Sequence, residues 1–424
     1  MIVVPFDQVA VPQSDKGKRL KQRDYLQEGL LAVIDQGQQH IGGYTNDQTM
    51  AFEGELPVVL FGDHTRSVKL VNHPFAVGAE GIKIFRPAVG VRAKYLYYWM
   101  KSAPIPDRGY GRHYQFLRQL NVPLPSEAQQ DEIVAELEKQ FSRLDEAVAN
   151  LRRVKANLKR YKASVLKAAV EGRLVETDAT LARREGRTYE TGEQLLQRIL
   201  EERRAKLAGK AKFKAPKKPS ESGLPELPEG WIWSSFEAVA DRVTVGHVGS
   251  MKNEYVEKGV PFLRSQNVRP NRFDPEGLKY ISEAFHASLT KSALSPGDIA
   301  VVRSGSVGVS CVIPDTLPDA NCSDLVIIKG PRGVESHYGA YYLNSVVESR
   351  IAAGRVGVAL VHFNTQSVAE LPLPLPPMAE QLRIAAEVDR HLSIIREVES
   401  EVDANLQRAQ ALQQATLAKA FAVD

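Results

Sequence analysis

The stretch "FGDHTR", from Phe61 to Arg66, brings an aspartate, a histidine and an arginine together. Asp63 and His64 could bind a metal ion in a nuclease, but such a site would need further acidic residues at matched spacing. A histidine in a β-turn could instead contact a phosphate or a base, and a purely structural turn would carry the same residues. The residues favour these last two alternatives over the nuclease and do not separate them.

The common catalytic signatures are absent from the sequence. "SGSVGVSC", from Ser304, has glycines but lacks the Gly-Lys-Ser/Thr of a phosphate-binding loop. The Asn/Asp-Pro-Pro-aromatic tetrad of enzymes that methylate exocyclic amines is missing, as are His-Glu-x-x-His and Gly-x-Ser-x-Gly. Cys311 and Cys322 show no zinc-binding or disulfide spacing, which is typical of the reducing cytoplasm. We therefore expect a cytoplasmic protein that is not an enzyme.

Composition and charge are those of a soluble protein with more than one core. The 424 residues exceed one ordinary domain, and 43% apolar with 25% charged residues is typical of globular chains. The first residues, "MIVVPFDQVA", lack the features of a signal peptide, and no run of about 18 apolar residues predicts a membrane span. A net charge of +4 permits a nucleic-acid partner without requiring one.

Two distant stretches, "VPLPSEAQQDEIVAELE" from Val122 and "LPLPPMAEQLRIAAEVD" from Leu373, are nearly the same. Shifting the chain by 251 residues places Gln130 on Gln381. Each stretch ends a strand-rich region with Pro-x-Pro, where proline removes ladder donors, and then begins a helix. Upstream, "PFDQVA" resembles "SFEAVA", so the sequence predicts two similar globular units that differ in their middles.

Both predicted helices carry apolar residues every seven positions. Positions 137, 144, 151, 158 and 165 hold Leu, Leu, Leu, Leu and Val, and positions 388, 395 and 402 hold Val, Ile and Val. Sustained heptads favour coiled-coil packing over packing of each helix on its own unit alone. The economical arrangement is two long antiparallel helices with one α/β (α+β) unit at each end, a pseudo-twofold dumbbell.

Between the first helix and the second unit lies a segment of different composition, residues 173–230. Within it, "ETGEQLLQRILEERRAKLAGK" predicts an amphipathic helix capped by Thr188 or Thr191. The following residues are basic, with eight Lys or Arg and no acidic residue over 203–218. A solvated linker and a phosphate-contacting arm both fit this composition.

Together these motifs resemble the specificity subunits of type I restriction-modification systems. "GRHYQFLRQLNVPLPSEAQQDEIVAELE" and "VHFNTQSVAELPLPLPPMAEQLRIAAEV" resemble the ends of that family's two target-recognition domains, each running into its conserved helix. "YKASVLKAAVEGRLV" resembles the close of the central conserved region. The first unit departs from the pattern because it lacks the Gly-Trp lead-in of the second. The resemblance covers essentially the whole chain and places target-recognition domain 1 at 1–125, the central conserved helix at 126–172, the linker at 173–230, target-recognition domain 2 at 231–375 and the distal conserved helix at 376–424.

The resemblance implies a non-catalytic reader of double-stranded DNA. Each unit would bind one half of a split asymmetric target, and the helices would set the gap and dock partner subunits. The partners would be two adenine-methyltransferase (modification) subunits that use S-adenosylmethionine, joined in some assemblies by restriction subunits that translocate DNA with ATP and Mg²⁺. This chain would itself need no cofactor, metal or membrane.

The duplicated units also predict a DNA-binding protein of this kind without the resemblance. Two similar but unequal units in tandem suit an interrupted asymmetric site, whereas the equal units of a homodimer read a palindrome. One turn of helix more or less, about 3–4 residues, should then change the gap by about one base pair. Charged residues away from the heptad seam are candidates for docking the partners: Glu132, Glu136, Arg143, Arg383 and Glu387.

Candidate DNA contacts follow from side-chain chemistry, because arginine can fork onto guanine and glutamine or asparagine can pair with adenine. Glycines beside several of these residues would let the backbone approach DNA closely. In the first unit the candidates are Gln36, Gln38, Gln39, Tyr44, His64, Arg66, Lys69, Tyr110, Arg112 and His113. In the second unit they are Arg264, Gln266, Asn267, Arg269, Arg303, Ser304, His362 and Asn364.

Structural alternatives stand beside these candidates. His113 and Asn364 occupy equivalent places in the repeat and could simply brace the last strand, and Arg66 and Arg303 could be ordinary surface charges. For the whole chain, the rival hypothesis is a coiled-coil assembly adaptor without DNA binding. It would explain the heptads but not the duplicated units rich in glycine, arginine and glutamine.

Overall fold

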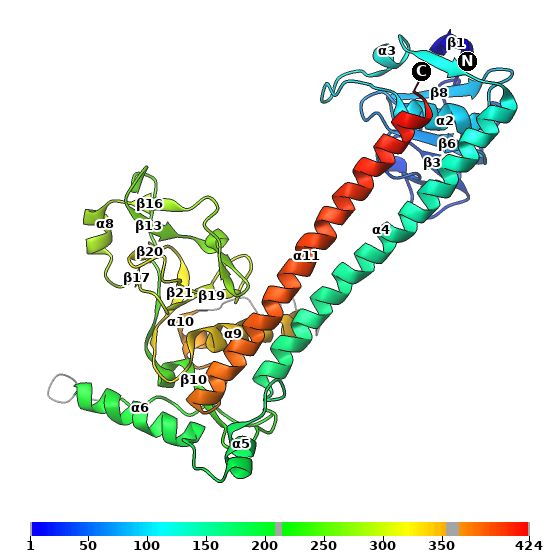
Figure 1. The fold of residues 1–424 in the computed structure, drawn as a ribbon. Helices are drawn as coiled ribbons and strands as arrows, with labels where there is room; N and C mark the ends of the chain where they lie inside the picture. Colours follow the sequence, from blue (N-terminus) through cyan, green and yellow to red (C-terminus); the bar gives the residue numbers. More distant parts are fainter. Residues whose placement is uncertain (1, 208–213, 353–363, 423–424) are drawn as a thin grey trace. The chain divides into compact units, whose positions relative to one another are not determined.

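The computed structural model describes residues 2–207, 214–352 and 364–422 (Figure 1). The chain forms two compact units: unit 1 comprises Met1–Val154 with Ser400–Asp424, and unit 2 comprises Lys155–Glu399. Each unit mixes helices with sheets, so the predicted α/β (α+β) class is confirmed. His362 and residues 208–213 of the basic segment lie outside the described residues.

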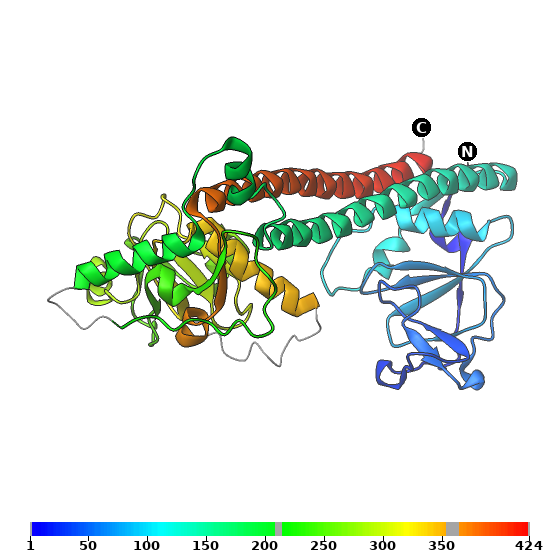
Figure 2. The same ribbon diagram turned by 90° about the horizontal axis from the view of Figure 1, so that it is seen from below.

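Unit 1 is built on a four-stranded antiparallel sheet in the order β2-β8-β5-β6. A second sheet has the order β4-β3-β7, with β3 and β7 parallel. Figure 2 shows helix α2 (Ala93–Ser102) between the strands and the start of α4 (Glu127–Val170), where Trp99 and Phe141 share one core. The strands are β2 (Ala10–Gln13), β3 (Leu31–Ile34), β4 (Gly43–Thr45), β5 (Val58–Gly62), β6 (Val68–Val71), β7 (Phe75–Val77) and β8 (Ile82–Pro87).

Unit 2 repeats this plan with additional strands. Its four-stranded antiparallel sheet has the order β11-β21-β18-β19, and a five-stranded sheet, β12-β16-β13-β20-β17, again contains one parallel pair, β13 and β20. The main strands are β11 (Ala240–Val245), β13 (Val260–Leu263), β18 (Ile299–Val302), β19 (Ser310–Val312), β20 (Ala320–Cys322) and β21 (Leu325–Pro331). The smaller elements are β12 (Tyr255–Val256), β14 (Val268–Arg269), β15 (Arg272–Phe273), β16 (Lys279–Ile281), β17 (Ala293–Leu294), α8 (Glu283–Ser288), α9 (Ser336–Ala352) and α10 (Thr365–Ala369).

The central strand of each sheet is a continuous apolar run because both of its faces are buried. In β5, Val59 and Phe61 pack in the core that contains α2, while Val58 and Leu60 face a separate apolar cluster. The side chains of β18 alternate in the same way between two cores. The two units therefore share a strand order and also the packing of one central strand between two apolar cores.

The repeated Pro-x-Pro stretches form the last strand of each unit. β9 (Asn121–Leu124) pairs with β1 (Ile2–Pro5), and β22 (Pro372–Leu375) pairs with β10 (Ile232–Ser235). Short helices follow the first strands, α1 (Phe6–Val9) and α7 (Phe236–Val239). Because each ladder has only two strands, the prolines need not supply donors to a further neighbour.

Buried glutamines explain why the two helix starts share a sequence. Gln130 accepts a hydrogen bond from the Arg92 N–H at 2.8 Å and donates to the carbonyls of Gly90 and Pro125. Gln381 repeats the arrangement with the N–H of Glu335 and the carbonyls of Gly333 and Pro376. Both glutamine side chains are fully buried, and each pins a long helix to the preceding loop of its unit.

The two long helices are α4 (Glu127–Val170) and α11 (Met378–Ala420). In unit 1, the start of α4 packs against the end of α11, where Leu137 meets Leu417 and Phe421. In unit 2, the end of α4 packs against the start of α11, where Val165 belongs to one core with Val388. The heptad residues thus form the antiparallel contact within each unit. No helix among the described residues is long and apolar enough to cross a membrane.

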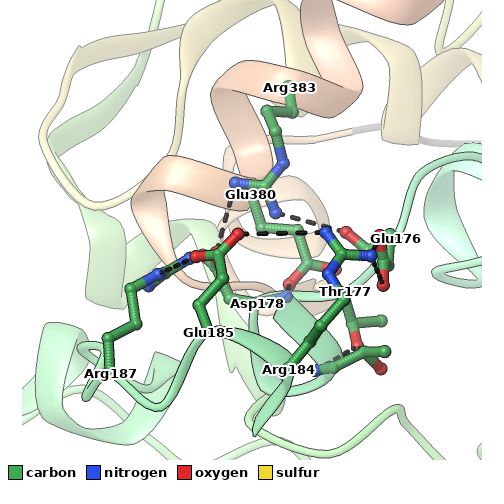
Figure 3. A network of polar contacts seen from close by, with 9 residues as sticks. Glu176, Thr177, Asp178, Arg184, Glu185, Arg187, Glu380 and Arg383 are labelled. Carbon is green, nitrogen blue, oxygen red and sulfur yellow. Dashed lines mark hydrogen bonds and ion pairs between the residues drawn. The ribbon is translucent and has the colours of Figure 1, made fainter. Parts of the chain in front are cut away.

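Two helices follow α4 in unit 2, α5 (Asp178–Glu185) and α6 (Gly192–Leu207). Figure 3 shows a polar network around the buried Asp178 and Glu380 that ties α5 to the start of α11. Glu380 accepts hydrogen bonds from the Asp178 N–H and from Trp231 Nε1, both at 2.9 Å. Arg383 lies 3.1 Å from the buried Asp178 carboxylate. Burial raises the pKa of Glu380 in spite of its two donors.

The cap of α6 is Thr191, one of the two residues that the sequence offered. Its Oγ1 accepts from the Gln194 N–H, and the Gln194 side chain accepts from the Thr191 N–H at 2.9 Å. This reciprocal pair is a capping box, which satisfies two backbone donors at the helix start.

Candidate nucleic-acid interface

Three loops meet at one edge of unit 1. The loop after β3 begins at Asp35, the loop after its parallel neighbour β7 begins at Gly78, and the β5–β6 turn lies between them. Gln36 joins all three, because its side chain donates to the Glu80 carbonyl and accepts from the His64 N–H. Parallel strands end at the same edge, so this convergence follows from the topology.

The β5–β6 turn presents His64 and Arg66 together with the segment 105–113. The His64 ring stacks on the exposed Tyr110 ring, with centroids 4.8 Å apart and planes 10° apart. Arg66 has a positive φ of 58° and pairs with the exposed Asp107 at 2.6 Å. Arg112 is exposed on the same segment. These four candidates form one cluster, in which Arg66, Tyr110 and Arg112 are exposed and His64 is half-buried.

Asp63 and His113 lie beneath this cluster. The Asp63 carboxylate accepts from the Tyr114 N–H at 2.8 Å, and the Asp63 carbonyl accepts from the His113 N–H at 2.8 Å. Both side chains are buried, so they hold the turn against the segment 105–113. Over residues 2–207, 214–352 and 364–422 no group of three His, Cys, Asp or Glu side chains is arranged to hold a metal ion.

A polar hollow of about 620 Å³ adjoins the turn in unit 1. It brings together Gln38, Arg66 and Lys69 of the predicted residues, with His40 and Lys101. Lys69 is 4% exposed and donates to the carbonyls of Asp35 and Gln39, and burial lowers its pKa. Burial and the neighbouring Lys69 lower the pKa of His40. Arg66 and Lys101 bring positive charge to the hollow and Gln38 brings an exposed amide, a combination that suits a phosphate or a base edge.

Gln38 and Gln39 are exposed beside the hollow, and Tyr44 is half-buried on β4. His40 and Lys101 did not stand out in the sequence, although His40 directly follows the run of glutamines. Lys101 lies at the end of α2, and only the fold brings it to this loop.

Unit 2 has the same three-loop arrangement with different side chains. Arg264 follows β13, Ser323 follows the parallel strand β20, and the β18–β19 turn carries Arg303. The Ser323 N–H donates to the Leu263 carbonyl at 3.0 Å, and Arg303 pairs with Asp324 at 2.8 Å. Arg303 thus sits on the hairpin that corresponds to the one carrying Arg66.

The turn after β13 holds three further candidates. Gln266 is exposed, and its amide lies 3.4 Å from the Gly277 carbonyl, which also accepts from Arg264 at 2.8 Å. Asn267 is fully buried and donates to the carbonyls of Asp274 and Glu276. Arg269 is exposed and pairs with Asp274 at 3.1 Å.

The remaining candidates of unit 2 lie in two places. Ser304 is exposed beside Arg303, on a loop in which Gly305 and Gly308 adopt positive φ. Asn364 caps α10 by accepting from the Ser367 N–H at 2.8 Å. Asn364 therefore has a structural role at the start of α10.

Known proteins of one kind resemble this chain. No family model matches the chain. It is 24% identical over 200 residues to the Type I restriction enzyme EcoDI specificity subunit of Escherichia coli, covering 47% of this chain and 43% of that protein. It is 26% identical over 266 residues to the EcoEI specificity subunit of Escherichia coli, covering 59% and 42%. The matches thus span less than half the length of these relatives.

Two solved structures share the fold of the chain. One comes from work on complex assembly and conformational transition of the type I R-M system, with a TM-score of 0.63 and 16% identity over 99% of this chain and 97% of that one. The HsdS subunit from Thermoanaerobacter tengcongensis has a TM-score of 0.50 and 15% identity over 99% and 96%. The resemblance to type I specificity subunits is therefore confirmed in sequence and fold.

Proposed function

We propose that this chain, a relative of the type I specificity subunits, is the subunit that gives a restriction-modification complex its DNA sequence specificity. Each unit would bind one half of a split asymmetric target, and the long helices would set the gap between the halves. The observation that carries this proposal is the duplicated three-loop edge, which has one backbone plan and two different sets of side chains. A shared frame with different polar residues suits two different half-sites.

The exposed side chains of the two edges suit base and phosphate contacts. Arg66 pairs with the exposed Asp107 and donates to the Ile105 carbonyl at 3.2 Å, and Arg303 pairs with the partly exposed Asp324. Such ion pairs at the surface contribute little stability, so both arginines can exchange aspartate for DNA at low cost. The contacts proposed for unit 1 are Gln38, Gln39, Arg66, Tyr110 and Arg112, and those for unit 2 are Arg264, Gln266, Arg269, Arg303 and Ser304. Lys69, His113 and Asn267 are assigned the role of holding these loops in place.

The proposed partners are two adenine-methyltransferase subunits, with restriction subunits that add DNA translocation and cleavage. An apolar groove of about 500 Å³ in unit 1 supports helix docking; it lies between the start of α4 and the end of α11. Leu137 and Leu412 line the groove, and Leu412 is 57% exposed. Glu136, one of the predicted docking residues, lies at the same groove.

In the proposed complex, this chain catalyses no reaction itself. S-adenosylmethionine would bind the methyltransferase subunits, and ATP and Mg²⁺ would serve the restriction subunits. The chain's own contribution would be the positioning of bound DNA relative to those active sites.

The proposal is tested by co-expressing the chain with its genomic neighbour methyltransferase in a host that lacks DNA methylation. Single-molecule sequencing should then find N6-methyladenine in one split asymmetric motif, and the motif should disappear when this chain is omitted. A soluble, stable complex that leaves no new methylation would contradict the proposal and favour an assembly adaptor.

A further inference from the structure

Helix α6 covers one face of unit 2 closely. Its residues Leu195 and Ile199 are buried in the same core as Phe236 and Val239 of α7. The Gly192 N–H donates to the Gly230 carbonyl at 2.7 Å, so the start of α6 lies directly on the entry to β10. A side chain at position 192 would collide with the Leu375 carbonyl of β22.

One stripe of α6 makes these contacts. Ile199 lies against Gly333, where a Cβ atom would collide with Ile199 Cδ1. Arg203 donates to the Glu237 carbonyl at 2.7 Å. Leu195, Ile199 and Arg203 are four positions apart, which places them on one side of the helix.

The corresponding face of unit 1 is open. Ile2, the counterpart of Ile232, is 70% exposed, and Val89 in the turn beside Gly90 is fully exposed. At Gly90, the counterpart of Gly333, a Cβ atom would meet only Glu127 Oε1 at 3.9 Å. Leu124 is partly exposed, whereas its counterpart Leu375 is fully buried. No described helix of unit 1 covers this face.

These residues form one continuous surface, which we call the β1 face: Ile2, Val89, Gly90 and Leu124. Ile2 pairs with Leu124 across the β1–β9 ladder. Gln130 joins the other side, because its amide donates both to Pro125, next to Leu124, and to Gly90. Asp7 occupies the position of Glu237, whose backbone carbonyl accepts from Arg203 in unit 2, and the exposed Asp7 carboxylate pairs with Arg118 at 3.0 Å.

We infer that the β1 face is the docking site of an amphipathic helix from a separate protein chain. The helix carries two aliphatic residues four positions apart and an arginine four positions later, the pattern of Leu195, Ile199 and Arg203. The repeat supplies the reason: the same frame in unit 2 is completed by a helix of this chemistry. Such a helix buries its aliphatic pair against Ile2 and Val89 and brings its arginine to the backbone carbonyl of Asp7, as Arg203 meets the Glu237 carbonyl in unit 2. The inference concerns a protein contact and does not depend on DNA recognition.

The test uses the full-length chain and a fluorescent peptide of residues 190–207, stapled on its solvent side because short free helices are marginal in water. Fluorescence anisotropy should give saturable binding with one peptide per chain. Ile2→Asp and Val89→Asp should each weaken binding by about tenfold or more, since an aliphatic contact is replaced by a charge. The matched control is Leu30→Asp, another exposed apolar residue of unit 1, which should leave binding unchanged.

Hydrogen exchange separates docking on unit 1 from exchange with α6 in unit 2. The bound peptide should protect residues 2–9 and 86–92. No saturable binding, binding that survives both the Ile2 and Val89 substitutions, or protection confined to residues 232–239 would overturn the inference. Thermal melting checks that each variant is folded. Neither DNA binding nor methylation is read out, so this test can fail independently of the proposed function.

Discussion

Asn267 lies in a loop that the sequence predicts to contact DNA, and its side chain stabilises the backbone of that loop. Its side chain is fully buried, accepts from the Arg264 N–H and donates to two carbonyls of the same turn. Asn267→Ala would leave these backbone groups without partners, and we expect unit 2 to lose about 2–4 kcal/mol of stability.

The matched control is the neighbouring, exposed Gln266→Ala, which should change stability by less than about 0.5 kcal/mol. Denaturant-dependent hydrogen exchange of peptides from unit 2 measures both variants in the intact chain. Equal stability of the two variants would show that the Asn267 bonds do not hold the turn.

Glu380 makes the stability of unit 2 depend on pH. Its folded-state pKa is raised by burial, so the folded unit keeps a proton at pH values where the unfolded chain has lost it. Stability therefore falls as the pH rises through this window. Asp178 and Arg383 are the charged groups that face Glu380, and the raised pKa already includes their effects. Glu380→Gln removes the titration, so the stability of the variant relative to the parent should increase from acid to neutral pH.

Glu387, about two turns further along α11, provides a control with the opposite sign. Arg390 lowers the pKa of Glu387, so Glu387→Gln should lose stability relative to the parent as the pH rises towards the ordinary glutamate pKa, which is more acidic than the window of Glu380. Thermal unfolding of the parent and both variants across both pH ranges makes the comparison. Parallel curves for Glu380→Gln and the parent would contradict the assigned titration.

At the scale of elements, the long helices determine how far apart the two halves of the target lie in the proposed function. Inserting one heptad after Leu144 in α4 and one after Val402 in α11 keeps both apolar seams in register. Seven residues add about 10.5 Å of helix, and DNA rises about 3.4 Å per base pair, so the gap should lengthen by about two to three base pairs.

The measurement is the methylated motif of the lengthened chain in the co-expression system. Both half-sites should keep their sequences, because the reading loops are unchanged. An unchanged gap would mean that the helices do not determine it. As a control, a four-residue insertion in both helices breaks the heptad and should reduce the yield of folded chain.

The elements that the sequence predicted best are those with local signals. Heptads at Leu137 and Val388, the Thr191 cap and the repeated Pro-x-Pro strands all depend on residues close together in the chain. The three-loop edges proposed to contact DNA form where loops from distant parts of the chain meet. No local sequence pattern encodes such a meeting. Lys101, for example, reaches the hollow of unit 1 only because α2 packs on the sheet. A structural role for His113 was already an alternative in the sequence, whereas those of Lys69 and Asn267 depend on the folded loops. Lys69 donates to carbonyls of the loop after β3, and Asn267 bonds within its own turn, whose conformation no local pattern predicts.

At the scale of the whole molecule, the proposed function requires two DNA-binding units that share one backbone plan and differ in their loops. Substitutions in one unit should therefore alter one half of the target and leave the other half intact. The two sets of residues are Tyr110 with Arg112 in unit 1 and Arg264 with Gln266 in unit 2.

The most direct measurement maps the methylated motif of two double variants, Tyr110→Ala with Arg112→Ala and Arg264→Ala with Gln266→Ala. Each lost base contact costs about 1–3 kcal/mol of discrimination, so each variant should relax some positions of its half-site. We expect the first variant to change only one half of the motif and the second variant only the other. If both variants alter the same half, or both leave the motif as it was, the assignment of one half-site to each unit is wrong.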